Sequence, residues 1–151
     1  MLKSLAVLLS CVSVVSPVLA SESIFKSPSY ARKFLDLHKD GPGWLQLQAD
    51  GPRSWIYFPM LLQARCATSE IRYSVNSDAL DQVFAQPMCD LTMPAGLPED
   101  TKLSAISVSL GPPPVETVSV QVVFNDGSKS DVLTYTPCPD IGRGVCAVRL
   151  Q

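Results

Sequence analysis

The chain has very little histidine and none of the short motifs that mark the common enzyme classes. Its single histidine, His38, lies beside Lys39. Serine and cysteine nucleophiles normally need a histidine base near neutral pH, and both the Gly-x-Ser-x-Gly elbow and the Cys-Gly-Ser-Cys signature are absent. Phosphate-binding loops and dinucleotide fingerprints are absent as well. These absences argue against the commonest hydrolases and nucleotide-binding enzymes.

Charge of either sign is also scarce along the sequence. Twelve Lys and Arg residues are interspersed with fourteen Asp and Glu residues, and the formal net charge is −2. A protein that binds nucleic acid normally presents a basic face, and the sequence shows no basic cluster. We therefore expect no nucleic-acid partner.

Beyond its first twenty residues the chain lacks any apolar run that approaches the roughly 20 residues needed to cross a membrane. Those first residues combine Lys3, an apolar stretch over residues 5–15 and Ala20 at their end. This pattern predicts a cleavable secretory signal over residues 1–20, with cleavage after Ala20. A lipoprotein acylated at Cys11 is an alternative, but Leu9 stands where a small residue is preferred. We expect a periplasmic or secreted protein whose mature chain has no membrane span.

The rest of the chain has the length of one domain. Residues 44–151 are expected to form it, after an N-terminal helix or arm over residues 21–43. No Asn-x-Ser/Thr acceptor occurs in this part of the chain, which favours a bacterial periplasm as the compartment.

Four cysteines remain once the signal is removed, namely Cys66, Cys89, Cys138 and Cys146. An even number of cysteines in an exported chain predicts two disulfides. Of the three possible pairings, nearness in sequence favours Cys66–Cys89 with Cys138–Cys146. A zinc site would need the tight Cys-x₂₋₄-Cys spacing, which these cysteines lack.

No other metal or cofactor is predicted. A blue-copper site needs two histidines beside a cysteine and a methionine, and the chain has only His38. A copper(I) site built from Met60, Met88 and Met93 is an alternative, although methionine more often fills gaps in a core.

The residue pattern predicts one short helix followed by short strands. Ser27 can cap a helix and Pro28 suits its first turn, so a helix is expected over residues 30–40. Alternation of apolar and polar residues then predicts strands over residues 44–48, 55–58, 71–76, 82–85, 103–110, 118–124, 129–135 and 146–150. Because Pro59 cannot donate to a ladder, we expect a bulge or a change of sheet edge there.

The strongest local signal is a hairpin. Val118, Val120 and Val122 share one face, and Asn125-Asp126-Gly127 predicts a type I turn with a left-handed glycine and a bulge. The pattern ISVSL…VSVQVVFNDGSKSDVLTYTPC is similar to the closing hairpin of immunoglobulin-like and fibronectin-like domains. With seven or eight short strands, the sequence predicts a mainly β fold, an antiparallel immunoglobulin-like β-sandwich, with a small open β-barrel as the alternative.

Three aromatic residues are the candidate binding residues. Trp44 is expected on the polar side of its strand, and Trp55 and Tyr57 share one face of the next strand, opposite Ile56 and Phe58. Where such a face is exposed, it offers a flat platform to a sugar ring or a partner protein. Where it is covered, the same aromatics belong to the core.

The sequence therefore predicts an exported, disulfide-stabilised binding module without catalysis, whose partner is a protein or a cell-envelope glycan. One alternative is a small secreted hydrolase that uses a cysteine or a carboxylate pair such as Asp78 with Asp81 or Glu99 with Asp100. Another is an accessory subunit or inhibitor that presents residues 87–98, an irregular stretch bounded by prolines.

Overall fold

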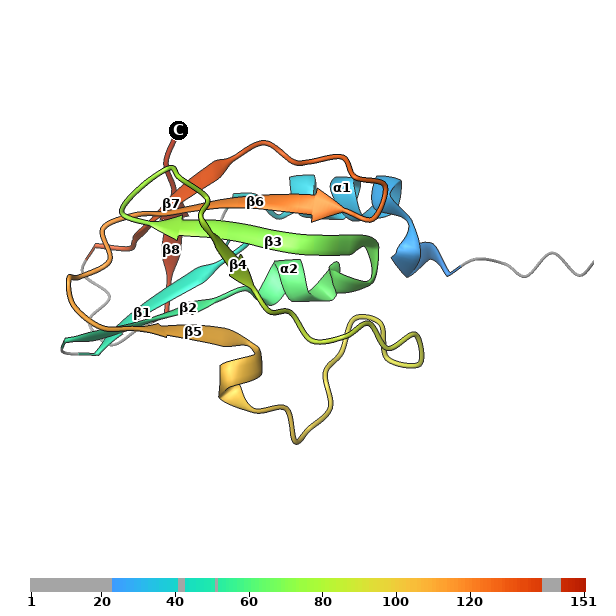
Figure 1. Cartoon of the computed structure of the whole chain (residues 1–151), viewed down its shortest axis with the longest axis horizontal. Coiled ribbons are helices and arrows are strands. Elements are labelled where there is room, and N and C mark those ends of the chain that lie inside the picture. Colours follow the sequence, from blue (N-terminus) through green and yellow to red (C-terminus); the bar gives the residue numbers. More distant parts are fainter. Residues whose placement is uncertain (1–22, 41–42, 51, 140–144) are drawn as a thin grey trace, which may run out of the picture.

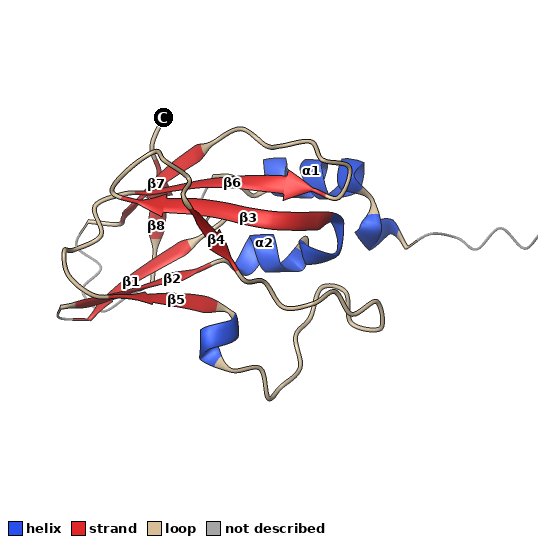
Figure 2. Cartoon of the chain, viewed as in Figure 1, coloured by secondary structure: helices blue, strands red, loops and turns tan. Residues whose placement is uncertain are grey.

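Two antiparallel β-sheets form the body of the chain in this computed structural model, which describes residues 23–40, 43–50, 52–139 and 145–151 (Figures 1 and 2). One sheet has three strands in the order β1-β2-β5, and the other has five in the order β4-β3-β6-β7-β8. The strands are β1 (Gln46–Asp50), β2 (Arg53–Tyr57), β3 (Thr68–Val75), β4 (Gln82–Phe84), β5 (Ser107–Leu110), β6 (Val118–Phe124), β7 (Leu133–Pro137) and β8 (Ala147–Arg149).

The hydrophobic core lies between these two sheets. Ile56 of the three-stranded sheet and Val120 of the five-stranded sheet are both fully buried and belong to one hydrophobic cluster. Phe58, just after β2, brings its ring centroid to 4.6 Å from that of Phe84 in β4. The sheets are not closed into a barrel, and the mainly β arrangement is consistent with the predicted β-sandwich. The immunoglobulin-like form of that sandwich stays a prediction.

The predicted N-terminal helix is confirmed as α1 (Pro28–Leu37), preceded by the short 3-10 helix η1 (Ile24–Lys26). The Ser27 hydroxyl accepts a hydrogen bond from the backbone N–H of Tyr30, and Pro28 occupies the first turn, where no donor is needed. The buried side chains of Ala31 and Leu35 pack into the common core. The helix therefore shares the hydrophobic core of the two sheets.

The stretch after β2 differs from the prediction. The expected bulge or change of edge at Pro59 was wrong, because Pro59 begins the short helix α2 (Pro59–Gln63), which is followed by the 3-10 helix η2 (Arg65–Ala67). Proline at the first helical position loses no hydrogen bond, and α2 buries Leu61 and Leu62 in the core.

The predicted hairpin is confirmed at its turn. The N–H of Gly127 donates to the carbonyl of Phe124 at 2.9 Å, and the N–H of Phe124 donates to the carbonyl of Ser128 at 2.8 Å. Gly127 has φ +79°, the left-handed conformation that the predicted turn needs. The returning strand β7 starts only at Leu133, because the ladder shifts register between the Val123–Lys129 bridge and the Val120–Leu133 pair.

The predicted strand over residues 103–110 is shorter than expected. Its first part is the 3-10 helix η3 (Leu103–Ala105), and β5 begins at Ser107, which is paired with Tyr57. Since β2 ends at Tyr57 and the chain turns into α2, residues before Ser107 have no strand to pair with. Strand length here is set by the partner strand and not by the local alternation.

The predicted signal over residues 1–20 and its cleavage site lie outside the described residues. Within residues 23–40, 43–50, 52–139 and 145–151, no helix has both the length and the apolar character needed to cross a membrane.

Candidate binding surface around residues 87–98

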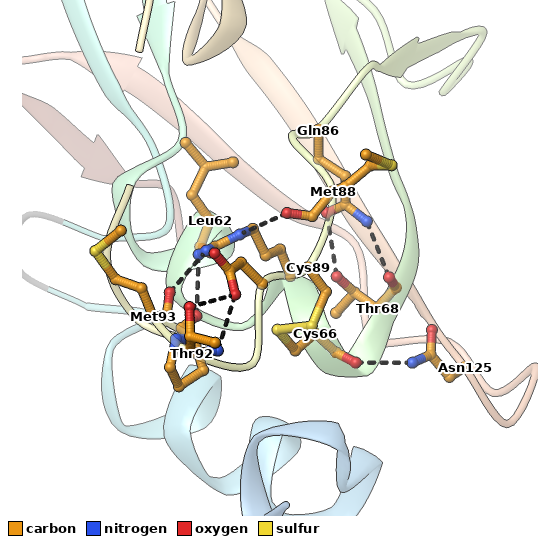
Figure 3. Close-up of a disulfide and its surroundings, with 12 residues drawn as sticks. Leu62, Cys66, Thr68, Gln86, Met88, Cys89, Thr92, Met93 and Asn125 are labelled. Atoms are coloured by element: carbon orange, nitrogen blue, oxygen red, sulfur yellow. Dashed lines mark hydrogen bonds between the residues drawn. A yellow bond between two sulfur atoms is a disulfide. The ribbon is translucent and has the colours of Figure 1, made fainter. Parts of the chain in front are cut away.

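Two disulfides pair the four cysteines as the sequence predicts. Cys66 is bonded to Cys89 and Cys138 to Cys146, with Cα atoms 4.8 Å and 5.5 Å apart. Cys66 is buried in η2, whereas Cys89 is exposed on the irregular segment Pro87 to Pro98, called segment 87–98 below. The first disulfide therefore ties this segment to the core (Figure 3).

The buried side chain of Arg65 also holds segment 87–98. Arg65 is 3% exposed, and each of its five N–H donors has a backbone carbonyl as partner. The acceptors are the carbonyl oxygens of Leu62, Met88, Met93, Pro94 and Gly96, at 2.6 to 3.4 Å. Burial lowers the pKa of Arg65 from its usual value, and the negative charge of Asp90 opposes that shift. Carbonyl dipoles thus compensate a buried charge, and four of the five belong to segment 87–98.

Further hydrogen bonds hold the entrance and the turn of the segment. Gln86 donates to the carbonyl of Thr68 at 2.9 Å and accepts from the Thr68 hydroxyl at 3.2 Å (Figure 3). The Asp90 carboxylate accepts from both the backbone N–H and the hydroxyl of Thr92, at 2.8 and 2.7 Å. The hydroxyl bond, then the backbone bond, lowers the pKa of Asp90. Segment 87–98 is therefore ordered without being part of a helix or a strand.

This firmly held segment exposes large apolar side chains. Met88 is 92% exposed, Leu91 44% and Met93 39%. Apolar residues usually turn toward a core when a chain has freedom to bury them. Here the backbone around them is held by a disulfide and by buried hydrogen bonds, so the side chains stay directed to solvent.

A hollow lies on either side of the segment. One, of about 530 Å³, lies between segment 87–98 and η3 and is lined by Pro87, Met93 and Lys102 among others. The other, of about 370 Å³, is mostly apolar and is lined by Tyr57, Leu62 and Ile106 among others. Arg65 and Leu97 line both hollows, so the anchor of the segment also shapes the spaces beside it.

Trp44 does not lie where the sequence places it. It is 4% exposed, its indole N–H donates to the carbonyl of Leu35 at 2.8 Å, and its backbone N–H donates to the Tyr135 hydroxyl at 3.3 Å. Strand β1 begins only at Gln46, so Trp44 is outside the alternation that predicted a polar face for it. It joins α1 to the sheet and is not an exposed aromatic platform.

Trp55 and Tyr57 are half-buried on one face of β2, opposite the fully buried Ile56. Trp55 is paired with Gln48 of β1 and with Ser109 of β5, and the Tyr57 hydroxyl donates to the Gln48 side chain at 3.0 Å. Tyr57 also lines the apolar hollow beside segment 87–98. This face of the three-stranded sheet is therefore continuous with the surface around the segment.

The candidate catalytic residues make other contacts or are exposed to solvent. Cys66 is half of a disulfide, so its sulfur is no thiolate nucleophile. His38 bonds the Phe34 carbonyl through Nδ1 at 2.7 Å, and the Asp78 carboxylate accepts from the Ser119 hydroxyl at 2.9 Å. Glu99 is exposed to solvent, as are Asp81 and Asp100. Across the described part of the chain, no three His, Cys, Asp or Glu side chains gather as a metal site would require.

Sequence reasoning singled out residues 87–98 but missed Arg65, which organises them. The available signal was weak: an arginine beside Cys66, at the end of an apolar stretch. Its five acceptors are backbone carbonyls between Leu62 and Gly96. Every residue type has such a carbonyl, so the sequence does not show which residues accept.

Comparison with known protein families, with curated proteins and with solved structures finds no match for this chain. Its function is therefore argued from its geometry.

Proposed function

We propose that this chain is an exported, disulfide-stabilised binding module without catalysis, and that segment 87–98 contacts a protein partner. The observation that carries the proposal is the exposure of Met88, Leu91 and Met93 on a backbone held by Arg65 and by the Cys66–Cys89 disulfide. Exposed apolar side chains that cluster on one segment are typical of interaction surfaces.

The rigid backbone supports this proposal energetically. Binding normally costs about 0.5–1.5 kcal/mol for each side chain that is ordered at an interface, and more when a loop is ordered too. Here the loop is already ordered when the chain folds. Association therefore does not carry the entropic cost of ordering it, and apolar contacts with a partner contribute more to the net binding free energy. Methionine suits such a surface because its unbranched, polarisable side chain adapts to the shape of a partner.

The surroundings of the segment also favour a protein as partner. The two adjacent hollows, of about 370 and 530 Å³, are large enough to receive side chains of a second molecule. The disulfides are consistent with an oxidising compartment outside the cytoplasm, and the predicted signal over residues 1–20 agrees with it.

The test compares capture of a partner by three forms of the chain, from the medium or envelope extract of the source cells. The second form carries Met88→Ser, Leu91→Ser and Met93→Ser. The third is a matched control with three exposed apolar residues replaced elsewhere, Ile24→Ser, Leu37→Ser and Leu150→Ser. We expect a protein that the unchanged chain and the control retain and that the segment variant loses. A photo-crosslinker at position 88 should attach to the same protein.

Equal capture by all three forms would refute the role of segment 87–98. Loss in both variants would mean that general surface hydrophobicity, and not this segment, retains the partner.

A cell-envelope glycan is the second candidate ligand, supported by the half-buried aromatic pair Trp55 and Tyr57 beside the amide of Gln48. Aromatic faces stack on sugar rings while amides bond their hydroxyls. Titration with envelope glycan fragments should then change the fluorescence of Trp55, and Trp55→Phe should abolish the change while buried Trp44 stays silent. An equal change in the Trp55→Phe protein would contradict this role.

A further inference from the structure

A third hollow, far from segment 87–98, gathers cationic side chains from three elements. It measures about 460 Å³ and lies between α1, the β6–β7 hairpin and β8. Among the described residues, five cationic side chains line it, namely Arg32, Lys33, Lys39, Lys129 and Arg149. In Figure 1, α1 lies beside β6 on one side of the molecule, whereas segment 87–98 extends on the other side, beyond α2. We call this hollow the cationic groove.

The cationic groove is positive although the chain as a whole is negative. Among the described residues, two carboxylates, Asp36 and Asp131, line it beside the five cations, while the net charge of the chain is −2. Two more carboxylates adjoin it, since Asp126 pairs with Arg32 and Asp40 pairs with Arg149, each at 2.6 Å. Even with these included, the five cations outnumber the four carboxylates in the part of the chain that the structure describes.

The cations differ in how far they are already engaged. Lys39 pairs with Asp36 at 2.6 Å. Within the described ranges, Lys33 of α1 and Lys129 after the hairpin turn have no ion-pair partner. Arg149 uses only Nε toward Asp40, so the donors on its two Nη atoms have no partner among these residues. The cationic groove therefore receives hydrogen-bond donors from three separate parts of the chain, at Lys33, Lys129 and Arg149.

The frame of the groove is rigid. The guanidinium of Arg32 lies over the ring of Phe124 at 4.6 Å and donates to the side chains of Asp126 and Ser128. These contacts join α1 to the hairpin turn. The floor consists of buried apolar side chains, Leu35 and Trp44 among them. Such a floor lowers the local dielectric, which strengthens the attraction between the cations and an anion bound above it.

We propose that the cationic groove binds a phosphate or sulfate group, held by Lys33, Lys129 and Arg149. A tetrahedral oxyanion fits because it carries up to two charges and several acceptor oxygens, and so engages donors that arrive from three directions. Lysine binds phosphate as a point charge, and the planar fork of arginine bonds two oxygens at once. The proposal does not depend on the function proposed for segment 87–98.

The test is an amide NMR titration of the folded chain at low ionic strength, with three probes. The probes are inorganic phosphate and sulfate, a soluble phosphate monoester such as glycerol phosphate, and vesicles of phosphatidylglycerol in phosphatidylcholine. Vesicles of phosphatidylcholine alone are the reference for the third probe. With the soluble probes we expect saturable shifts at Lys33, Lys129, Ser130 and Arg149, and with vesicles that bind we expect saturable loss of amide signal intensity. Because the interaction is electrostatic, added salt should weaken it.

The source of the oxyanion follows from which probe binds. Saturation with the soluble probes indicates a soluble phosphate or sulfate ligand, and binding to the anionic vesicles alone indicates a lipid headgroup. Either result supports the groove as an oxyanion site. Absence of any saturable change with all three probes would overturn the proposal.

A matched pair of double variants tests the residues. Lys33→Gln with Lys129→Gln removes two donors from the groove, whereas Lys26→Gln with Arg53→Gln removes two exposed charges outside it. We expect the first variant to weaken binding by about tenfold or more and the second to change it little, because charge-assisted hydrogen bonds are lost only in the first. Equal weakening in both would assign the effect to net charge and overturn the proposal.

Discussion

At the scale of single residues, hydrogen bonds from buried polar side chains hold irregular segments that lie outside the helices and strands. The guanidinium of Arg65 supplies every one of its five donors to backbone carbonyls, and the Tyr135 hydroxyl donates to the Lys39 carbonyl at 2.9 Å while it accepts from Trp44. Among the described residues, no buried side-chain nitrogen or oxygen lacks a partner. Because such groups are fully engaged, even conservative substitutions leave buried acceptors unpaired.

The first prediction concerns Arg65. Arg65→Lys should lower the free energy of unfolding by about 3 kcal/mol, because lysine has three donors and cannot reach five carbonyls in one plane. Urea denaturation monitored by circular dichroism measures the loss. Arg72→Lys is the matched control, since the ion pair of Arg72 with Glu70 is partly exposed and should contribute less than about 1 kcal/mol. Equal effects of the two changes would contradict the role of Arg65.

The second prediction concerns Tyr135 and pH. Burial raises the pKa of Tyr135 to about 12, whereas a tyrosine in the unfolded chain ionises near pH 10. The unfolded state then loses this proton first, so stability is intact below pH 10 and falls between pH 10 and about 12, by about 1.4 kcal/mol per pH unit.

Denaturation curves recorded at pH 9, 10, 11 and 12 measure this fall. Tyr135→Phe removes the titrating group and should flatten that part of the profile, although it also loses two hydrogen bonds and so lowers stability at neutral pH. An unchanged slope in Tyr135→Phe would assign the fall to other groups.

At the scale of elements, the position of each strand depends on its neighbour. Strand β5 begins at Ser107 because β2 ends at Tyr57, and β2 ends there because Pro59 starts a helix. Segment 87–98 has no partner strand, so the Cys66–Cys89 disulfide and the side chain of Arg65 hold it instead. The two kinds of element should respond differently when a covalent link is removed.

The third prediction concerns the two disulfides. Cys66→Ala with Cys89→Ala should increase amide hydrogen exchange throughout segment 87–98 while β3 and β6 stay protected, because those strands pair with each other and not with the segment. Cys138→Ala with Cys146→Ala is the control and should leave exchange in the segment unchanged. In the chain-entropy account, the first pair costs about 1 kcal/mol more, since it closes the longer loop, with a sequence separation of 23 against 8.

Unchanged exchange in segment 87–98 after loss of Cys66–Cys89 would mean that Arg65 alone holds it. The double variant combined with Arg65→Lys would then be needed to release the segment.

At the scale of the whole molecule, one core serves both sheets. Ile56 of β2 and Val120 of β6 belong to the same buried cluster, and α1 adds Leu35 to it. The buried hydrophobic residues of both sheets form one cluster, so neither sheet has an apolar core of its own. The described residues should therefore unfold as one cooperative unit.

The fourth prediction follows from this shared core. Ile56→Ala in one sheet and Val120→Ala in the other should each lower stability by about 2–4 kcal/mol. In both variants, tryptophan fluorescence and far-ultraviolet circular dichroism should report coincident transitions. Val148→Ala, at a 46% exposed position in β8, is the control and should change stability by about 0.5 kcal/mol or less. Two separate transitions in either core variant would show that the sheets unfold independently.

The sequence by itself determined the features that depend on near neighbours. The hairpin turn at Asn125-Asp126-Gly127 and helix α1, with its Ser27 cap, follow from local backbone preferences. Both disulfide pairings also follow from nearness along the chain. The mainly β, two-sheet arrangement follows from short alternating strands.

Only the tertiary structure decided which residues meet over long sequence distances. Trp44 is buried because α1 packs on it, Arg65 finds acceptors up to 31 residues away, and Lys33 comes to share a groove with Lys129. Charges that alternate along the chain gather in space when the helix, the hairpin and β8 pack together. Local backbone preferences depend only on residues that are near in sequence. The contacts of the buried arginine and the cationic groove depend on tertiary packing, so the sequence alone does not predict them.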